Sequence, residues 1–353
     1  MAQSGGRPVF DFVGRRGWFY AFSALILAPG IISLLIPPAL NPGIDFSSGT
    51  TFTVRFEEPV TQDEVSGVMS DLDHPEARIQ GTGDNTFIVR TDVLQGATSA
   101  PPVGPQPVGE RDEIEEALMD EFGAFLDADG NVTDGFIEFD SIDATISSEI
   151  ARNAAIAVLV AAGAIFVYLW WSFRAVPRAF RFGTAAVLAL LHDALIVVGA
   201  FSILGKLIDT EINSFFITAL LTVIGFSVHD SIVVFDRIRE TVERGEGRTF
   251  AEAVNSSLLQ TLGRSLNTSL TLVFAILALM LMGGSSIREF LWAMLIGTVA
   301  GTYSSVFFAA QILVTWDEGD LPRLFRSIFG RGEEEDEEED EEFAEELPAR
   351  ADA

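Results

Sequence analysis

Residues 212–236 read INSFFITALLTVIGFSVHDSIVVFD, an apolar stretch that Asp230 interrupts and Asp236 ends. Its first part approaches the roughly 20 residues that a helix needs to cross a hydrocarbon core about 30 Å thick. Comparable apolar runs lie elsewhere, at 18–44, 153–173, 182–205 (broken by Asp193), 265–287 and 290–316. The sequence therefore predicts six membrane-spanning helices.

Basic residues are distributed unevenly between the two sides of these spans. The two short loops on one side contain only Lys206 and Arg288. Fourteen arginines lie near the membrane on the other side: Arg7, Arg15, Arg16, Arg174, Arg178, Arg181, Arg237, Arg239, Arg244, Arg248, Arg264, Arg323, Arg326 and Arg331. Because basic residues mark the cytoplasmic side, we expect a multi-pass plasma membrane protein with both termini in the cytoplasm.

Residues 39–149, between the first two spans, have the pattern of a soluble α+β domain. Thr61 and Glu64 form a capping-box pattern that predicts the start of a helix reaching about Leu72. A second helix is predicted at 110–123, and strands at 49–56, 77–80, 86–91 and 136–142. The order βαββαβ is that of the ferredoxin-like fold. The predicted fold class is an all-α membrane bundle of six transmembrane helices with an α+β ferredoxin-like external domain between helices 1 and 2.

The other segments follow from this division of the chain. We expect a cytoplasmic leader, a first span, a five-helix membrane domain with a helical cytoplasmic loop, and a disordered acidic tail. The leader is predicted at 1–17 and the first span at 18–38. The membrane domain is predicted at 150–316, with its loop at 236–263, and the tail at 317–353.

The net charge of −29 is concentrated in two segments. Residues 39–149 hold 24 acidic residues against four arginines, and residues 333–346 hold 12 acidic residues. Such a surface excludes nucleic acid as a partner. It favours a halophilic origin, because salt screens repulsion between like charges. A GC-rich genome with a locally acidic tail is the alternative.

Motifs that would indicate an enzyme are missing from the sequence. It has no cysteine, three histidines, and no HExxH, Walker A or GxSxG pattern. Residues 81–84 read GTGD, which imitates intramembrane aspartyl proteases but falls in the soluble domain. We therefore expect no catalytic residue, no metal and no cofactor.

Two carboxylates, Asp193 and Asp230, stand inside apolar runs. An ionised carboxylate there costs about 2.5–3.5 kcal/mol on insertion scales and is a functional candidate by default. Asp230 lies about 9 Å of helix rise above Asp236, and Arg264 begins the fifth span from the same side. Asp230 and Arg264 are therefore predicted to face each other, either as a proton switch or as a static salt bridge.

Histidines adjoin both of these acids. His192 precedes Asp193, and His229 precedes Asp230. Because neighbours on a helix point about 100° apart, neither pair is expected to face one partner jointly. Histidine titrates near neutrality, so both histidines are candidates for ion coupling. A hydrogen-bonding role for His229 and a structural role for Asp193 are the alternatives.

Four segments of the sequence resemble motifs of the SecD/SecF family of protein-export membrane proteins. They are Gly43-Ile-Asp-Phe-Ser-Ser-Gly-Thr50, Leu191-His-Asp-Ala194, the segment from Gly225 to Glu240, and the segment from Asn255 to Ser269. The resemblance covers about 18–316, and one modest domain among six spans favours the SecF half. In the first motif Ser48 replaces a glycine, so its backbone is expected to avoid conformations that need glycine.

The resemblance implies a function and a set of residues. It implies a subunit that uses a proton gradient with SecD to promote polypeptide export, in contact with a SecY-type channel, the translocating polypeptide and the lipid bilayer. Asp230 and Arg264 would be the coupling pair. Motif residues with a structural or boundary role are Gly43, Asp45, Phe46, Gly49, Asp236, Arg237, Arg239, Glu240, Asn267 and Thr268. The main alternative is half of a lipid or drug exporter of the resistance-nodulation-division type.

Overall fold

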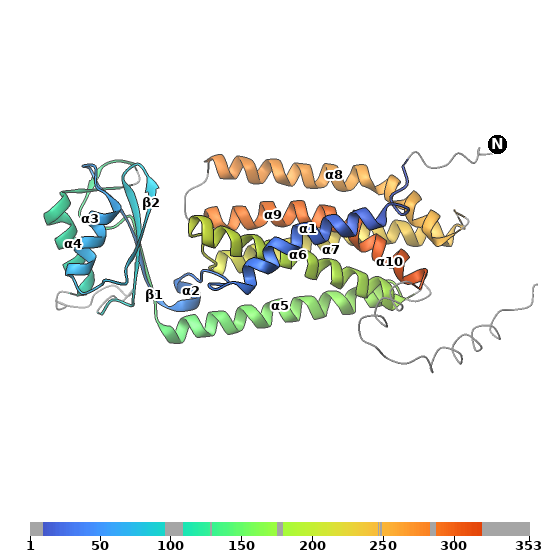
Figure 1. Cartoon of the computed structure of the whole chain (residues 1–353), viewed down its shortest axis with the longest axis horizontal. Helices are drawn as coiled ribbons and strands as arrows, with labels where there is room; N and C mark the ends of the chain where they lie inside the picture. Colours follow the sequence, from blue (N-terminus) through green and yellow to red (C-terminus); the bar gives the residue numbers. More distant parts are fainter. Residues whose placement is uncertain are drawn as a thin grey trace, which may run out of the picture.

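The computed structural model contains a bundle of long helices with a small α/β domain at one end (Figure 1). It describes residues 10–95, 109–127, 129–174, 179–245, 247, 249–282 and 287–319. The predicted acidic tail beyond residue 319, most of the leader and most of the loop at 96–109 lie outside the described residues.

Within the described residues, six helical segments are long and apolar enough to cross a membrane, which confirms the predicted number of candidate spans. The first five are α1 (Arg16–Leu35), α5 (Ala144–Ser172), α6 (Ala179–Ile208), α7 (Ser214–Glu243) and α8 (Phe250–Met282). The sixth consists of α9 (Arg288–Ser304), the π-helix η2 (Ser305–Ala309) and α10 (Ala310–Asp317). The polar segment predicted at 236–263 is helical at 236–243 and 250–263, where it extends α7 and α8.

The α/β domain follows a short helix, α2 (Ile44–Ser47), and has the predicted ferredoxin-like topology. Its antiparallel sheet has the order β2-β3-β1-β6. The strands are β1 (Gly49–Arg55), β2 (Arg78–Gly83), β3 (Thr86–Thr91) and β6 (Glu138–Ile142), with α3 (Gln62–Asp71) and α4 (Glu110–Phe122) beside them. The sequence did not predict the small pair β4 (Phe125–Leu126) and β5 (Val132–Thr133).

The domain has its own apolar core, and local sequence explains its first helix. The side chain of Thr61 and that of Glu64 cap each other's backbone N–H groups, so the predicted capping box is confirmed. Strand and helix residues such as Phe52, Val65 and Leu118 are fully buried together. The sheet and its helices therefore form a compact unit beside the bundle (Figure 1).

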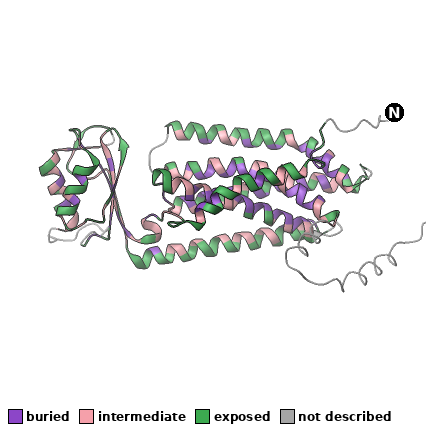
Figure 2. Cartoon of the chain, in the orientation of Figure 1, coloured by how far each residue is buried: buried purple, intermediate pink, exposed green. Residues whose placement is uncertain are grey.

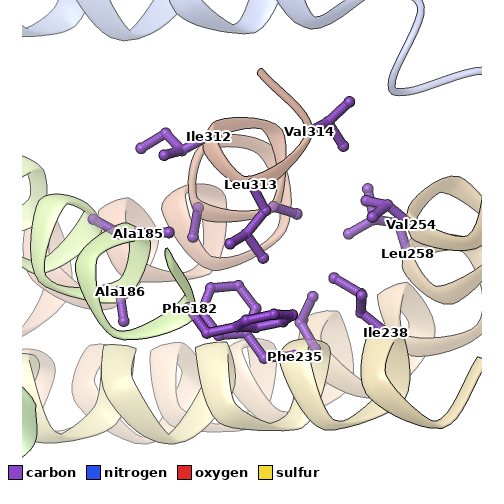
Figure 3. Close-up of a cluster of buried hydrophobic side chains, with 14 of the residues drawn as sticks. Phe182, Ala185, Ala186, Phe235, Ile238, Val254, Leu258, Ile312, Leu313 and Val314 are labelled. Carbon is purple, nitrogen blue, oxygen red and sulfur yellow. The ribbon is translucent and has the colours of Figure 1, made fainter. Parts of the chain in front are cut away.

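In the bundle, α7 and the sixth span are the most buried elements, whereas α1, α5 and α8 are largely exposed (Figure 2). Their exposed residues include large apolar ones such as Leu25, Leu159 and Phe274. This pattern suits a surface that faces lipid. At the end of the bundle away from the α/β domain, buried hydrophobic side chains from α6, α7, α8 and α10 pack together in one cluster (Figure 3). Phe182 and Phe235 meet there edge to face, with ring centroids 5.5 Å apart. The buried centre of the bundle is thus built around α7.

The span α1, which leads into the α/β domain, is held closely against α6. A Cβ added at Gly30 would lie 2.9 Å from Cα of Gly199, so only glycine permits this approach. Lys206, at the end of α6, donates to the Ser33 hydroxyl at 2.9 Å and to the Ile36 carbonyl oxygen at 2.8 Å. The second bond satisfies a carbonyl group that the end of α1 leaves open.

Candidate functional site

Asp230, on α7, is buried in the bundle and hydrogen-bonded by hydroxyl groups from two other helical segments. The Ser265 hydroxyl of α8 donates to its Oδ1 at 2.7 Å. The Ser305 hydroxyl, at the start of the π-helix, donates to its Oδ2 at 2.5 Å. Only 6% of Asp230 is exposed. Both carboxylate oxygens are therefore satisfied inside the bundle without a cation.

Asp193, on α6, has a similar environment and is completely buried. The hydroxyl groups of Ser227 and Ser304 each donate to its Oδ2 at 2.6 Å. His192 places its Nδ1 3.0 Å from Oδ1 of the same carboxylate. The two neighbours therefore contact each other through this pair of atoms, which does not test the expectation that they would not jointly face one partner.

The ring of His192 is held on its other side as well. It stacks on Phe308 of the π-helix, with ring centroids 4.4 Å apart. Its Nε2 is buried and has no hydrogen-bond partner among the described residues. His192 is thus a titratable group in an apolar setting, attached by one nitrogen to Asp193.

Ser304 and Ser305 connect the two carboxylates, and sequence reasoning did not single them out. They are consecutive residues, both fully buried, yet Ser304 donates to Asp193 and Ser305 to Asp230. The α-helix changes to a π-helix between them, and such changes are frequent at functional sites. The two acids therefore lie on either side of one irregular point in the sixth span.

Small residues bring the sixth span close enough for these bonds. A Cβ at Gly301 would lie 3.1 Å from the Ser227 Cβ, and one at Gly297 would lie 2.4 Å from a methyl group of Val223. The spacing Gly297-x-x-x-Gly301 is a recognised signature of close helix packing. That spacing was the available sequence signal for this part of the site.

Two of the predicted coupling residues, Arg264 and His229, lie outside this cluster. Both side chains are exposed, and Arg264 forms no ion pair within the described part of the chain. The predicted contact between Asp230 and Arg264 is therefore wrong for this arrangement. Their depths agree, but the next residue, Ser265, takes the position facing Asp230 because the helix turns about 100° per residue.

The predicted boundary residues form local contacts at the end of α7. Asp236 pairs with Arg239 at 2.8 Å, and Arg237 pairs with Glu240 and donates to Gln260 of α8. These contacts favour an anchoring role. On α8, Asn267 and Thr268 are exposed. Among the described residues, no group of three or more acidic or histidine side chains could hold a metal ion.

The first motif joins the α/β domain to the loop between α6 and α7. The Gly43 N–H donates to the Ile212 carbonyl oxygen at 2.8 Å, and Asp45 accepts the Ser214 N–H at 2.6 Å. Phe46, in the same motif, is partly buried on α2, which packs against α5.

The paired positions at 48 and 49 both adopt positive φ angles. Gly49 has φ +132°, and a Cβ there would lie 2.7 Å from the Thr91 carbonyl oxygen. The expectation for Ser48 is wrong, because it takes φ 62° despite its side chain. Its hydroxyl bonds the neighbouring Ser47 carbonyl oxygen, and its ψ of 166° places it in a backbone region that is almost restricted to glycine.

Two family models match this chain. The one described as "Protein export membrane protein SecD/SecF, C-terminal" matches residues 127–319, and "SecD/SecF GG Motif" matches residues 38–60. Over 318 residues the chain is 42% identical to the protein translocase subunit SecF of Thermobaculum terrenum, covering 90% of this chain and 97% of that protein. The chain belongs to the SecD/SecF family. It is a SecF subunit, a transport protein rather than an enzyme.

Larger relatives of this SecF subunit extend the comparison. The translocase subunit SecDF of Bacillus subtilis is 34% identical over 320 residues, which are 89% of this chain and 39% of that protein. The crystal structure of SecDF from Thermus thermophilus, described as a translocon-associated membrane protein, matches with a TM-score of 0.71 and 33% identity. The match covers 90% of this chain and 40% of that one. The exporter alternative is not supported by these relatives.

Proposed function

We propose that this SecF subunit of the Sec translocase, whose partner in protein export is SecD, moves protons through the region of Asp193 and Asp230. The single observation that carries the proposal is the bridge of Ser304 and Ser305 between the two buried acids. Asp230 is held in the apolar bundle by neutral hydroxyl groups, and Asp193 by hydroxyl groups and His192, so Asp230 is a proton acceptor without a fixed counter-charge. A static salt bridge would instead place a cation beside Asp230.

Protonation of Asp230 would change its contacts in a definite way. The ionised carboxylate accepts hydrogen bonds from Ser265 and Ser305. A protonated carboxyl has one donating oxygen, so one of these hydroxyl groups must turn or move away. Because Ser305 begins the π-helix, this rearrangement acts on the sixth span and, through Ser304, on Asp193. His192, bonded to Asp193, provides a further titratable group along the same path.

Arg264 has a role in this proposal through its place on α8. Because Arg264 and Ser265 are consecutive residues of a helix, their side chains point about 100° apart around its axis. A rotation of α8 by that amount would exchange the serine contact of Asp230 for an arginine contact. Arg264 would then stabilise the ionised acid, and its withdrawal would favour protonation.

SecD would cover the face that exposes Arg264. His229, Arg264, Asn267 and Thr268 all expose polar groups on helices that are otherwise apolar. Polar groups are costly against lipid, so a protein partner there is favoured. A six-span SecD bundle packed against α7 and α8 would shield these groups and complete a pseudosymmetric assembly.

Further expectations from the sequence belong to this proposal. The α/β domain would lie outside the cell, with both termini in the cytoplasm, and would hold the emerging polypeptide near a SecY-type channel. The excess of acidic residues is the basis of the hypothesis of a halophilic origin. The comparisons with known proteins do not support that hypothesis.

An export assay with three variants tests the proposal. Asp230→Asn keeps size and hydrogen bonding but removes the titrating proton, so export in a strain depleted of native SecF should fall to the level of the empty vector. Arg264→Lys keeps the charge and should impair export less than Arg264→Ala. Copurification with SecD shows that each variant is assembled. Normal export by Asp230→Asn contradicts proton coupling at this residue, and loss of the assembled protein would favour a structural role.

A further inference from the structure

The junction between the α/β domain and the bundle contains a partly buried ion pair. Arg90 of β3 pairs with Glu211 in the loop between α6 and α7, and their side chains are 20% and 9% exposed. The loop lies at the end of the bundle that carries the domain (Figure 1). Removing both charges from water costs free energy that the attraction between them only partly offsets. The pair is thus sensitive to the charge state of Glu211.

Backbone contacts fix Glu211 directly against the first motif. The Ile212 N–H donates to the Asn41 carbonyl oxygen at 2.9 Å, and the Gly43 N–H donates back to the Ile212 carbonyl oxygen at 2.8 Å. A Cβ added at Gly43 would lie 2.9 Å from Oε2 of Glu211. The carboxylate therefore fills space that only a glycine leaves, between the domain and the membrane helices.

Three charged groups act on Glu211 from the elements packed around it. Arg90 and Arg78 come from the sheet, and Glu289 comes from the first turn of α9. Burial is the largest influence and raises the pKa of Glu211 to about 7, with Arg90 opposing the rise and Glu289 adding to it. The ordinary glutamate value is 4.5, so the docked carboxyl holds a proton at pH values where a free one does not.

We propose that Glu211 is a proton-binding site at this junction, which fastens the α/β domain to the bundle when protonated and loosens it when ionised. The neutral carboxyl still accepts a hydrogen bond from Arg90 but no longer carries a buried charge. This proposal rests on the proposed function, because it assumes that the protons come from the side of the membrane on which the α/β domain lies. It adds a titrating step separate from Asp193 and Asp230.

The direction of the pH effect follows from linkage. A docked form with a pKa of about 7 binds protons more tightly than a released form at 4.5. Docking is therefore strongest below pH 4.5 and weakens as pH rises through 7. Between pH 5 and pH 8 the docking equilibrium constant should fall by about 70-fold.

Distance measurements on the full chain test this inference. The chain has no cysteine, so spin labels can be attached through Glu116→Cys on α4 and Leu281→Cys on α8, both exposed positions. In lipid nanodiscs, pulsed electron resonance should give one narrow distance at pH 5 and a broader, longer distribution at pH 8. Glu211→Gln mimics the protonated form and should keep the narrow distance at both pH values. Glu121→Gln, an exposed acid on α4, is the matched control and should respond as the unmodified chain does.

The same system separates failure of this inference from failure of the proposed function. An unchanged distance between pH 5 and pH 8, or a Glu211→Gln response equal to that of the unmodified chain, overturns the inference. Glu289→Gln removes a negative charge near Glu211, so it should move the midpoint to lower pH, and an unmoved midpoint also contradicts the inference. The nanodisc experiment involves no gradient and no export, so Asp230→Asn should leave its outcome unchanged.

Discussion

At the scale of residues, the two consecutive serines distinguish this site from a pair of isolated buried acids. Ser304 and Ser305 point to different carboxylates, on α6 and α7, from one place in the sixth span. Any change in the winding of that span would disturb both contacts. The proposed function therefore assigns to these two serines the physical coupling between Asp193 and Asp230.

Ser305→Ala should weaken the site through Asp230. The substitution removes one of two hydroxyl donors to a buried carboxylate, and a hydrogen bond to a charged group contributes about 1.5–3 kcal/mol. Thermal unfolding in detergent should show a lower midpoint than for Ser148→Ala, whose exposed hydroxyl bonds only its own helix on α5. In an Asp230→Asn background the loss should shrink, because the charge is gone. An equal loss in both backgrounds would contradict a direct role at Asp230.

Residue-scale reasoning from sequence found the acids but not their partners. Asp193 and Asp230 were identifiable because a carboxylate within an apolar run is costly. The pairing of Arg264 with Asp230 is predicted from their depth and from the family resemblance, and neither fixes the rotation of a helix. The rotation instead brings Ser265 to the acid. Serine is common in membrane spans, so nothing in the sequence separated Ser304 and Ser305 from other serines.

At the scale of elements, the sixth span depends on two glycines where it crosses α7. The structure leaves no room for a methyl group at Gly297, because it would lie 2.4 Å from Val223. A methyl group at Gly301 would also be crowded, at 3.1 Å from the Ser227 Cβ. Val223 is branched at Cβ and buried, so it has little freedom to move away. This close packing sets the position of the π-helix and the serines that follow.

Gly297→Ala should therefore destabilise the bundle by about 1–3 kcal/mol, the usual cost of overpacking. Gly163→Ala on α5 is the matched control, because a Cβ there meets no atom within 4 Å. The control should be neutral or gain roughly 0.5–1 kcal/mol from better helix propensity. Denaturant or thermal unfolding of the two variants compares these effects. Equal stability of both variants would show that the α7 contact is looser than described.

The thermal stability of the α/β domain is predicted to depend on the salt concentration. Residues 39–149 have 4 arginines and 24 acidic residues, a balance of −20. Expressed alone, the domain should melt at a lower temperature as salt falls from molar to about 0.1 M, since the screening length grows from about 3 to about 10 Å. Calorimetry across that range measures the effect. An unchanged melting temperature would leave the halophilic origin without support.

Element types were more predictable than element ends or irregularities. Six spans and the order βαββαβ followed from apolar runs, alternation and one capping box, all of which are local signals. The π-helix after Ser304 was not predictable, because it results from packing against α6 and α7 and not from a local pattern. The positive φ of Ser48 was missed for the same reason, since the sheet edge at Gly49 and Thr91 imposes it.

At the scale of the whole molecule, the even number of candidate spans predicts that the segments before α1 and after α10 lie on the same side of the membrane. Arginines predict that this side is the cytoplasm. A tag inserted at residue 345 should therefore be inaccessible to an impermeant reagent in intact cells, while a tag at an exposed position of the domain such as Glu116 is labelled. Labelling of the tag at 345 in intact cells would reverse the proposed orientation.

We propose that Asp230 carries the coupling proton, and the proton flux through the reconstituted complex is a direct readout of that role. The chain is reconstituted with SecD in liposomes containing a pH-sensitive dye, and a pH gradient is imposed. The unmodified complex should acidify the lumen faster than empty liposomes, and Asp230→Asn should reduce the rate to the empty level while SecD stays bound. Flux by Asp230→Asn equal to that of the unmodified complex would contradict the claim.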